Sequence, residues 1–135
     1  MASSTKPGCC SLSVTIIGRD HAEIAGMLQE LDLQASTAAP STRTDPLLRE
    51  LIRTTLSHFA VEEAMMEATR YEVAWFHRLG HQLMTNQLRA LAASCRKGGL
   101  QQNAHLLNLI IESHFVHVKN EDQDYTLWLG AMARR

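Results

Sequence analysis

The chain has 135 residues, 45% of them hydrophobic and 5% aromatic, with 13 basic and 14 acidic side chains and a formal net charge of −1. This length suits one domain with a buried core, and the near-neutral mixture of charges excludes a strong electrostatic footprint for nucleic acid or an anionic membrane. No apolar run reaches the roughly 18 residues that a membrane-spanning helix needs, and no secretory signal is recognisable, so we expect a cytoplasmic protein.

The start of the chain predicts a flexible tail followed by an extended arm. Residues 1–10 are small and polar and contain a Pro-Gly pair, which is typical of poorly ordered chain ends. Residues 12–17 form a short β-branched run with no second strand to pair with, so we expect them to lie extended along the domain. The first helix is predicted over residues 19–33, and the whole domain over residues 11–135.

Three further helices are predicted after a loop at residues 34–45, which is rich in Ser, Thr and Pro. Asp45 followed by Pro46 is typical of an N-cap and a first helical turn, so the next helix is expected to begin there. Chain reversals are predicted near residues 68–71 and at residues 97–99, where a lysine precedes two glycines. Abundant Leu, Ala and Met favour helix over sheet. The predicted fold class is all-α, an antiparallel up-down-up-down four-helix bundle with an extended N-terminal arm.

Large apolar side chains along the predicted helices are expected to form the core. Trp75 and Met66 are most simply explained by packing, and the last helix of the bundle is expected to end near residue 122. The remainder is amphipathic and is predicted to pack back on the bundle through Leu127 and Trp128.

Two ligand pairs with helical spacing stand in the middle of the chain. His58 and Glu62 are four residues apart, as are His77 and His81. Residues at i and i+4 project from one face of an α-helix, so each pair could bind a metal ion with two side chains. The two pairs mirror each other about the boundary between Thr69 and Arg70, since His58 corresponds to His81 and Glu62 to His77. An antiparallel hairpin that turns there brings all four side chains to one level.

The same symmetry extends to the outer helices, because antiparallel helices bring residues equidistant from their shared turn to one depth. His81 and His117 are symmetric about Gly99, and His21 and His58 are symmetric about the middle of the first loop. Three independent turns thus place five histidines at one cross-section of a four-helix bundle. This pattern predicts a metal site.

The fourth helix offers two candidate carboxylates. On a regular α-helix Glu121 lies about 40° from His117 and Asp122 about 140°, so simple geometry favours Glu121. Asp122 requires the helix to end or to widen into a π-type turn. With Glu62 and one of these carboxylates, the site has five imidazoles and two carboxylates, enough for two bridged ions. This ligand set suits iron, manganese or zinc, but the glutamate base of a HExxH zinc protease is missing.

These spacings resemble the hemerythrin family, in particular the single-domain bacterial hemerythrins. The matching pattern is His58-Phe59-x-x-Glu62-Glu63-x-x-Met66, Tyr71, His77-x-x-x-His81 and His117-Val118-x-x-x-Asp122-x-x-Tyr125. The resemblance covers all four helices and implies a non-heme di-iron site, with an oxo or hydroxo bridge, that binds O2 at one iron. It implies that one iron is bound by His77, His81 and His117, the other by His21 and His58, and that Glu62 and Asp122 bridge them.

The resemblance also overrides the simple preference for Glu121, so we predict a helix distortion between His117 and Asp122. The resemblance further implies an O2 pocket, which we expect to include Phe59, Ile24, Val118, Ser113 and His114. Several features depart from the family, and two of them concern the site. Asp20 precedes His21 without the usual spacer, and Ser113 and His114 are polar where the family has large apolar side chains.

Two functions follow from this resemblance. The first is reversible O2 binding for storage, delivery or sensing, without enzymatic activity. The alternative is a di-iron redox enzyme, a peroxidase or an oxidase of O2 or NO, which the polar Ser113 and His114 favour. We expect a monomer that binds neither nucleic acid nor membrane and that passes oxygen or electrons to a protein acceptor.

Overall fold

The computed structural model describes the backbone of residues 2–37 and 43–134, and the side chains from residue 17 onward within those ranges. All regular structure in the described part is helical, which confirms the all-α class. The helices are α1 (Ala2–Ala35), α2 (Thr44–Ala68), α3 (Ala74–Gly98), α4 (Ala104–His117) and α5 (Gln123–Ala133). A 3₁₀ turn, Gln101–Asn103, precedes α4, and a π-helical segment, Val118–Asp122, joins α4 to α5.

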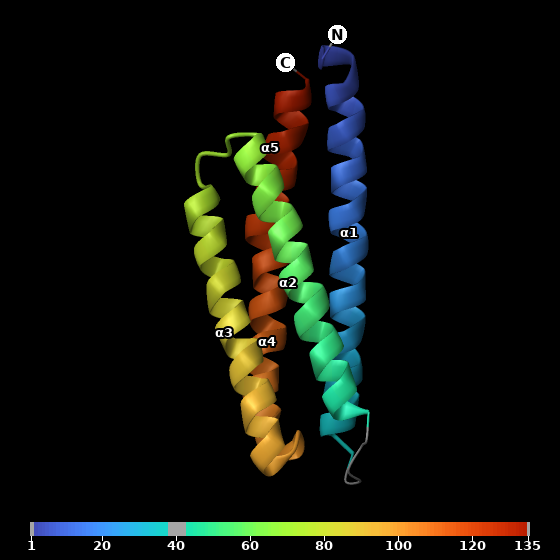
Figure 1. Ribbon diagram of the computed structural model, residues 1–135, viewed down its shortest axis with the longest axis vertical. Helices are drawn as coiled ribbons and strands as arrows, with labels where there is room; N and C mark the ends of the chain where they lie inside the picture. Colours follow the sequence, from blue (N-terminus) through green and yellow to red (C-terminus); the bar gives the residue numbers. More distant parts are fainter. Residues whose placement is uncertain (1, 38–42, 135) are drawn as a thin grey trace.

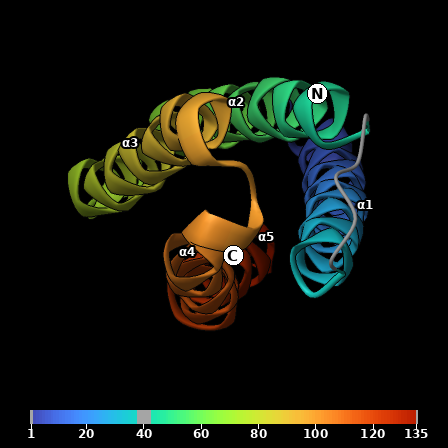
Figure 2. The same cartoon turned by 90° about the horizontal axis from the view of Figure 1, so that it is seen from below.

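The helices form a bundle in which neighbours along the chain run side by side. In Figure 1, α1 descends from the N-terminus, α2 ascends, α3 descends, and α4 with α5 ascends as one rod. Contacts join α1 to α2, α2 to α3 and α3 to α4, and the bundle closes where α1 meets α4 and α5. The end-on view in Figure 2 shows the helices arranged around a shared interior. The four rods therefore surround one axis.

The extended N-terminal arm is wrong, because residues 12–17 belong to α1. β-branched residues lower helix propensity only slightly, and packing can override that preference. Ile17 is 4% exposed and stands seven residues before Ile24, so the buried stripe of the helix continues into the predicted arm. Helix α1 also includes residues 2–10, which we predicted as a flexible tail. The division of the chain into tail and domain stays a prediction.

The connections differ in detail from their predictions. Residues 38–42 of the predicted first loop lie outside the described residues. Asp45 does not cap α2; Arg43 stands at the N-cap without a side-chain hydrogen bond, and Asp45 pairs with Arg49 in the first turn at 2.6 Å. The predicted reversal after α2 is confirmed, and Arg70 makes it in the left-handed region with φ 57°. Gly99, with φ 76°, takes the same region at the end of α3.

Two apolar clusters flank the middle of the bundle. The larger one, which we call the aliphatic cluster, fills the end next to the α3–α4 connection. It consists of Ile24, Leu28, Leu31, Leu48, Leu51, Leu88, Leu91, Leu100, Leu107 and Ile110. The smaller cluster, at the opposite end, contains Met66 and Tyr125 and has Trp128 packed against it. Leu127 and Trp75, by contrast, are 63% and 62% exposed, so their predicted packing is wrong.

Candidate metal centre

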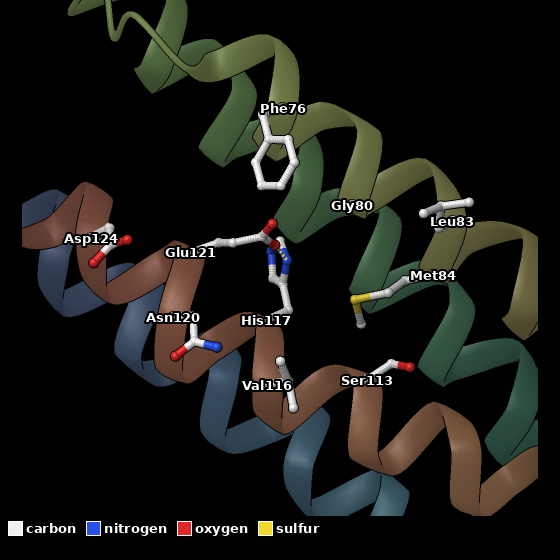
Figure 3. A pocket seen from close by; sticks show the side chains of 10 residues that line it. All are labelled: Phe76, Gly80, Leu83, Met84, Ser113, Val116, His117, Asn120, Glu121 and Asp124. Atoms are coloured by element: carbon white, nitrogen blue, oxygen red, sulfur yellow. Dashed lines mark ion pairs between the residues drawn. The ribbon is translucent and has the colours of Figure 1, made fainter.

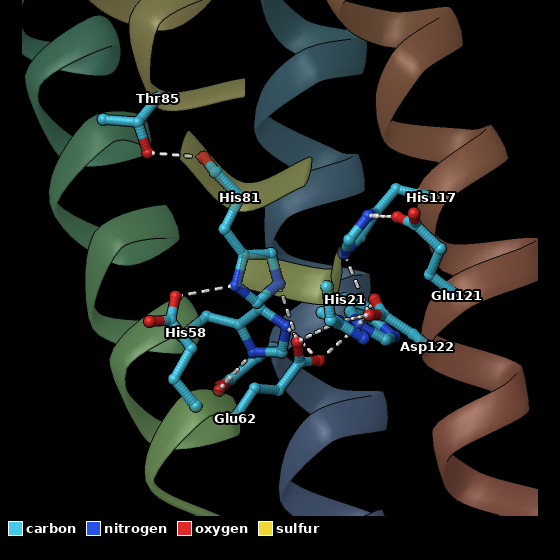
Figure 4. A network of polar contacts seen from close by, with 11 residues as sticks. His21, His58, Glu62, His81, Thr85, His117, Glu121 and Asp122 are labelled. Atoms are coloured by element: carbon cyan, nitrogen blue, oxygen red, sulfur yellow. Dashed lines mark hydrogen bonds and ion pairs between the residues drawn. The ribbon is translucent and has the colours of Figure 1, made fainter. Parts of the chain in front are cut away.

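Between the two apolar clusters lies a layer of buried polar side chains contributed by every rod of the bundle. We call it the metal layer; its members are His21, His58, Glu62, His77, His81, His117 and Asp122. Six of the seven are buried and His21 is half-buried. Figure 4 shows His21, His58, His81 and His117 converging on the carboxylates of Glu62 and Asp122. The structure therefore brings together all seven residues that were predicted from the sequence as ligands.

One half of the metal layer contains three histidines from α3 and α4. Asp122 Oδ1 lies 2.7 Å from His77 Nε2 and 3.0 Å from His117 Nε2. Glu62 Oε1 lies 3.0 Å from His81 Nε2 and 3.2 Å from His77 Nε2. One ligand atom from each of these five residues lies within 4.8 Å of every other. A single cation could contact all five.

The other half contains two histidines, from α1 and α2. Glu62 Oε2 lies 2.9 Å from His58 Nε2, and Asp122 Oδ2 lies 2.8 Å from His21 Nε2. These four residues form a second group whose ligand atoms lie within 4.8 Å of one another. Each carboxylate therefore turns one oxygen toward the three-histidine half and the other toward the two-histidine half. This is the arrangement required of carboxylates that bridge two ions.

The π-helical segment Val118–Asp122 brings Asp122 into the layer. Because the hydrogen bonds of a π turn join residues i and i+5, Asp122 comes back over His117 instead of pointing about 140° away. The predicted helix distortion is thus confirmed. Glu121 meets the other ring nitrogen of the same histidine, as an ion pair with His117 Nδ1 (Figure 4). The two neighbouring carboxylates therefore take different positions, one inside the layer and one outside it.

Two further carboxylates contact histidines of the layer from outside. Glu63 Oε2 lies 2.9 Å from His81 Nδ1, and Asp20 Oδ2 lies 3.1 Å from His58 Nδ1. A carboxylate only accepts, so each Nδ1 carries the proton and donates it. The Nε2 lone pair is then free to point into the layer, as metal-binding histidines require. Asp20 was not predicted in this role, because it contacts a histidine on the neighbouring helix and not the adjacent His21.

Gly80 on α3 makes room for the pair formed by His117 and Glu121. A Cβ at this position would lie 3.0 Å from Glu121 Oε2 and 3.2 Å from His117 Nδ1. Contacts this short would force the pair to shift away from α3. Glycine at residue 80 therefore permits the close approach of α4 that positions His117.

The hydrogen bonding of the layer is incomplete without a cation. Eight buried side-chain N or O atoms among the described residues have no hydrogen-bond partner, and six of them belong to the layer. These six are His21 Nε2, His58 Nε2, His81 Nε2, His117 Nε2, Glu62 Oε2 and Asp122 Oδ1. Their neighbours are close enough for hydrogen bonds but not suitably oriented. Unpaired polar atoms in an interior are costly, and cations would satisfy these nitrogen lone pairs and carboxylate oxygens together. The donor set fits metal ions.

The charges of the layer are strongly coupled. Burial opposes protonation of His21 and His77, but the close carboxylates of Asp122 and Glu62 outweigh it and raise the pKa of both histidines to about 9. Burial likewise opposes ionisation of Glu62 and Asp122, yet the surrounding histidines hold the pKa of both carboxyls far below the usual range. The carboxylates are thus ionised at every physiological pH, and protons compete with cations for the histidine nitrogens.

The predicted O2-pocket residues fall on two sides of the layer. Ile24 and His114 are buried, and the ring centroid of His114 lies 6.4 Å from that of His21, in the two-histidine half. Burial lowers the pKa of His114 to about 4, so the imidazole is neutral at pH 7. Phe59 is also buried and stacks on the ring of His81 with a centroid distance of 3.8 Å.

Ser113 lies elsewhere, in a surface pocket of about 480 Å³ between α3 and α4. Figure 3 shows this pocket with His117 and Glu121 at its inner wall and Gly80 on the facing helix. Ser113 is therefore on the outer side of the three-histidine half. Val118 is half-buried in the π-helical segment. The participation of these residues in a ligand pocket stays a prediction.

Comparison with known proteins gives a consistent family assignment. The family described as hemerythrin HHE cation binding domain matches residues 12–129. A bacteriohemerythrin of Pseudomonas aeruginosa strain LESB58 is 27% identical over 112 residues, which cover 83% of this chain and 72% of that protein. A bacteriohemerythrin of Stenotrophomonas maltophilia strain R551-3 is 24% identical over 115 residues, covering 85% and 74%. No solved structure matches the chain at comparable significance. Among the described residues, no helix combines the length and apolarity needed to cross a membrane.

Proposed function

The chain belongs to the hemerythrin family, and we propose that it binds O2 reversibly at two iron ions held in the metal layer. The observation that carries this proposal is the unequal size of the two halves. The three-histidine half offers three nitrogens and two oxygens to a cation, whereas the two-histidine half offers two nitrogens and two oxygens. A cation in the second half therefore has one protein ligand fewer, and that position is available to a small molecule.

Iron is the metal we propose because of the donor set and the function. Imidazole and carboxylate together suit iron, and two carboxylates shared between two sites hold the ions as a pair. Two ferrous ions supply the two electrons that reversible O2 binding requires. The bridging solvent oxygen implied by the family would complete six ligands in the larger half and five in the smaller.

Neighbouring side chains orient the ligands and cover part of the site. Asp20 and Glu63 accept from the Nδ1–H groups of His58 and His81 and so fix the orientation of both rings. Phe59 stacks on the imidazole of His81 and covers that face with an apolar ring. Both effects favour reversible ligand binding, because water and loose ligands promote loss of the ferrous state.

The deciding experiment is the optical spectrum of the iron-loaded, anaerobically reduced protein while O2 is admitted and then removed. We expect a ligand-to-iron charge-transfer band that appears with O2 and disappears on deoxygenation. The variant His58→Gln should lose the band, whereas His105→Gln, a change at an exposed histidine outside the layer, should retain it. Direct passage of the wild-type protein to a stable ferric spectrum would overturn the carrier function.

A second candidate function, a di-iron peroxidase or an oxidase of O2 or NO, is favoured by one observation. The buried imidazole of His114 stands beside His21 in the two-histidine half, where a polar group can move protons. This function requires steady turnover of peroxide with an electron donor. The turnover should be abolished by His114→Leu while the iron content stays unchanged.

A further inference from the structure

A second layer of four buried residues adjoins the metal layer. His21 and His58 pack together with a centroid distance of 4.8 Å, and His81 and His117 with a distance of 4.9 Å. Moving one helical turn from each histidine toward the aliphatic cluster reaches four residues at one shared level. They are Ile24, Thr55, Met84 and His114, each at most 5% exposed. We call these four residues the adjoining layer. Two are apolar and two are polar.

Thr55 contributes a hydroxyl that no other group satisfies. The residue is 1% exposed, and its Oγ1 is one of the two unpartnered buried atoms outside the metal layer among the described residues. A helical threonine commonly donates to the carbonyl of the preceding turn, but Thr55 does not. A buried hydroxyl without a partner costs free energy, so its presence calls for a partner other than the protein.

His114 contributes the second polar group on the opposite side of the bundle. Its ring is 4% exposed and meets the ring of His21 edge to face, with a centroid distance of 6.4 Å. A neutral imidazole offers one N–H donor and one acceptor. The polar part of the adjoining layer therefore lies beside the two-histidine half. The three-histidine half is different, because Phe59 covers His81 with an apolar ring.

Resting on the proposed function, we propose that Thr55 and His114 form a recognition subsite that donates hydrogen bonds to a small anion bound at the two-histidine half. The two-histidine half offers a cation one protein ligand fewer, so an anion could bind the cation there. Thr55 and His114 are the hydrogen-bonding side chains of the adjoining layer beside that half. A negatively charged ligand gains most from two donors in a dry interior, because hydrogen bonds to charged groups are the stronger ones. The subsite thus favours anionic ligands over neutral ones of the same size.

Azide binding to the iron-loaded, oxidised protein tests this subsite directly. We expect Thr55→Val and His114→Leu each to raise the azide Kd about tenfold, which corresponds to about 1.4 kcal/mol. The double variant should fall short of the product of the two effects if both residues contact the same anion. The matched control is Thr54→Val, because Thr54 neighbours Thr55 in sequence but its hydroxyl donates to Glu50 on the exposed side of α2. Its azide Kd should stay within twofold of the wild-type value.

Conservative variants separate recognition from packing. Thr55→Ser keeps the hydroxyl and His114→Gln keeps a donor, so both variants should bind azide almost as tightly as the wild-type protein. The infrared stretching frequency of azide bound to them should also stay close to the wild-type value. Iron content is measured for every variant, and His114→Phe, which also lacks a hydrogen-bond donor, replaces His114→Leu if the latter loses iron. Unchanged azide Kd in Thr55→Val and in the donor-free His114 variant, with iron retained, would overturn the subsite.

The proposed function and the subsite can fail separately. If the wild-type protein does not release O2 but the azide affinities change as expected, the carrier function fails and the subsite stands. If O2 binding is reversible but the azide affinities are the same in all variants, the subsite alone fails.

Discussion

The aliphatic cluster and the metal layer are built on the same helices but are stabilised in different ways. In the aliphatic cluster, residues such as Leu31, Leu51 and Leu91 are fully buried and stabilise the fold by removing apolar surface from water. In the metal layer, one helical turn or more away, buried polar atoms lack partners. One end of the bundle is therefore stabilised by apolar packing, whereas the middle contains polar atoms that bound cations could satisfy.

This contrast indicates that stability and function are divided along the bundle axis. Helix α2 passes through both regions, with Leu48 and Leu51 in the cluster and His58 and Glu62 in the layer. A local opening of the metal layer need not unfold the aliphatic end. The following predictions test this division, in order of decreasing expected effect.

Removing the metal should separate the two regions most strongly. If free iron is about a thousandfold above its Kd, loading stabilises the protein by about 4 kcal/mol, and chelation removes that contribution. Hydrogen exchange of α2 is the measurement: amides near His58 and Glu62 should lose protection on chelation, while those near Leu48 and Leu51 keep it. Equal loss along the whole helix would contradict the division.

A cavity in the aliphatic cluster should have the opposite effect. Leu91 is fully buried, so Leu91→Ala should lower the free energy of unfolding by about 3 kcal/mol without changing the iron content. Leu83→Ala on the same helix is the control, because Leu83 is 56% exposed and should cost less than about 0.5 kcal/mol. Denaturant unfolding gives the first quantity and metal analysis the second. Loss of iron from folded Leu91→Ala would show that the regions are coupled.

The pH dependence of stability should reveal the metal layer only when the metal is absent. The pKa values of His21 and His77 are raised from 6.5 to about 9 in the folded protein. Their contribution is therefore fully present below about pH 6.5 and is lost as the pH rises through about 9. We expect the metal-free protein to lose on the order of 2 kcal/mol between pH 7 and pH 10, with a matching fall in Tm. The iron-loaded protein should lack this fall, because its ring nitrogens bind metal and not protons.

The smallest expected effect concerns Glu121, the carboxylate that pairs with His117 from outside the layer. Glu121→Gln removes the charge that orients His117, and it should weaken iron binding about tenfold. Glu112→Gln, an exposed position on the same helix, should leave the affinity unchanged. Gly80→Ala should weaken iron binding in the same direction as Glu121→Gln, because its Cβ would displace the pair. Competition with a chelator of known affinity measures all three. A normal affinity in both Glu121→Gln and Gly80→Ala would show that the outer carboxylate does not support the site.

Much of this arrangement could be predicted from spacing. Antiparallel helices convert distances along the chain into depth, so the symmetry of His58 with His81, and of each with an outer histidine, was enough to gather the layer. The resemblance to a family identified Asp122 over Glu121. Buried residues along α4 and α5 are spaced by three or four residues, except for a spacing of five between His117 and Asp122. This longer spacing also indicates a π turn at that place.

Other features depend on contacts that no local pattern contains. Asp20 stands next to His21 in sequence but accepts from His58 on another helix. The unpartnered hydroxyl of Thr55 is visible only once the packing is known, because threonine in a helix usually bonds to its own backbone. The β-branched run at residues 12–17 misled the prediction of the arm, because intrinsic propensity is a weak guide when an apolar stripe continues through the segment.

The π-helical segment also determines which face of the C-terminal helix turns inward. The residue that it adds to the turn rotates everything downstream, so the inward positions of Tyr125 and Leu129 share the phase of Asp122 and not that of His117. A regular helix of the same length would instead put Glu121 in place of Asp122 and turn the buried face of the C-terminal helix away from the bundle. The carboxylate and the helix that follows it are therefore one unit, and only the loss of a residue between His117 and Asp122 could make the helix regular while keeping both in place.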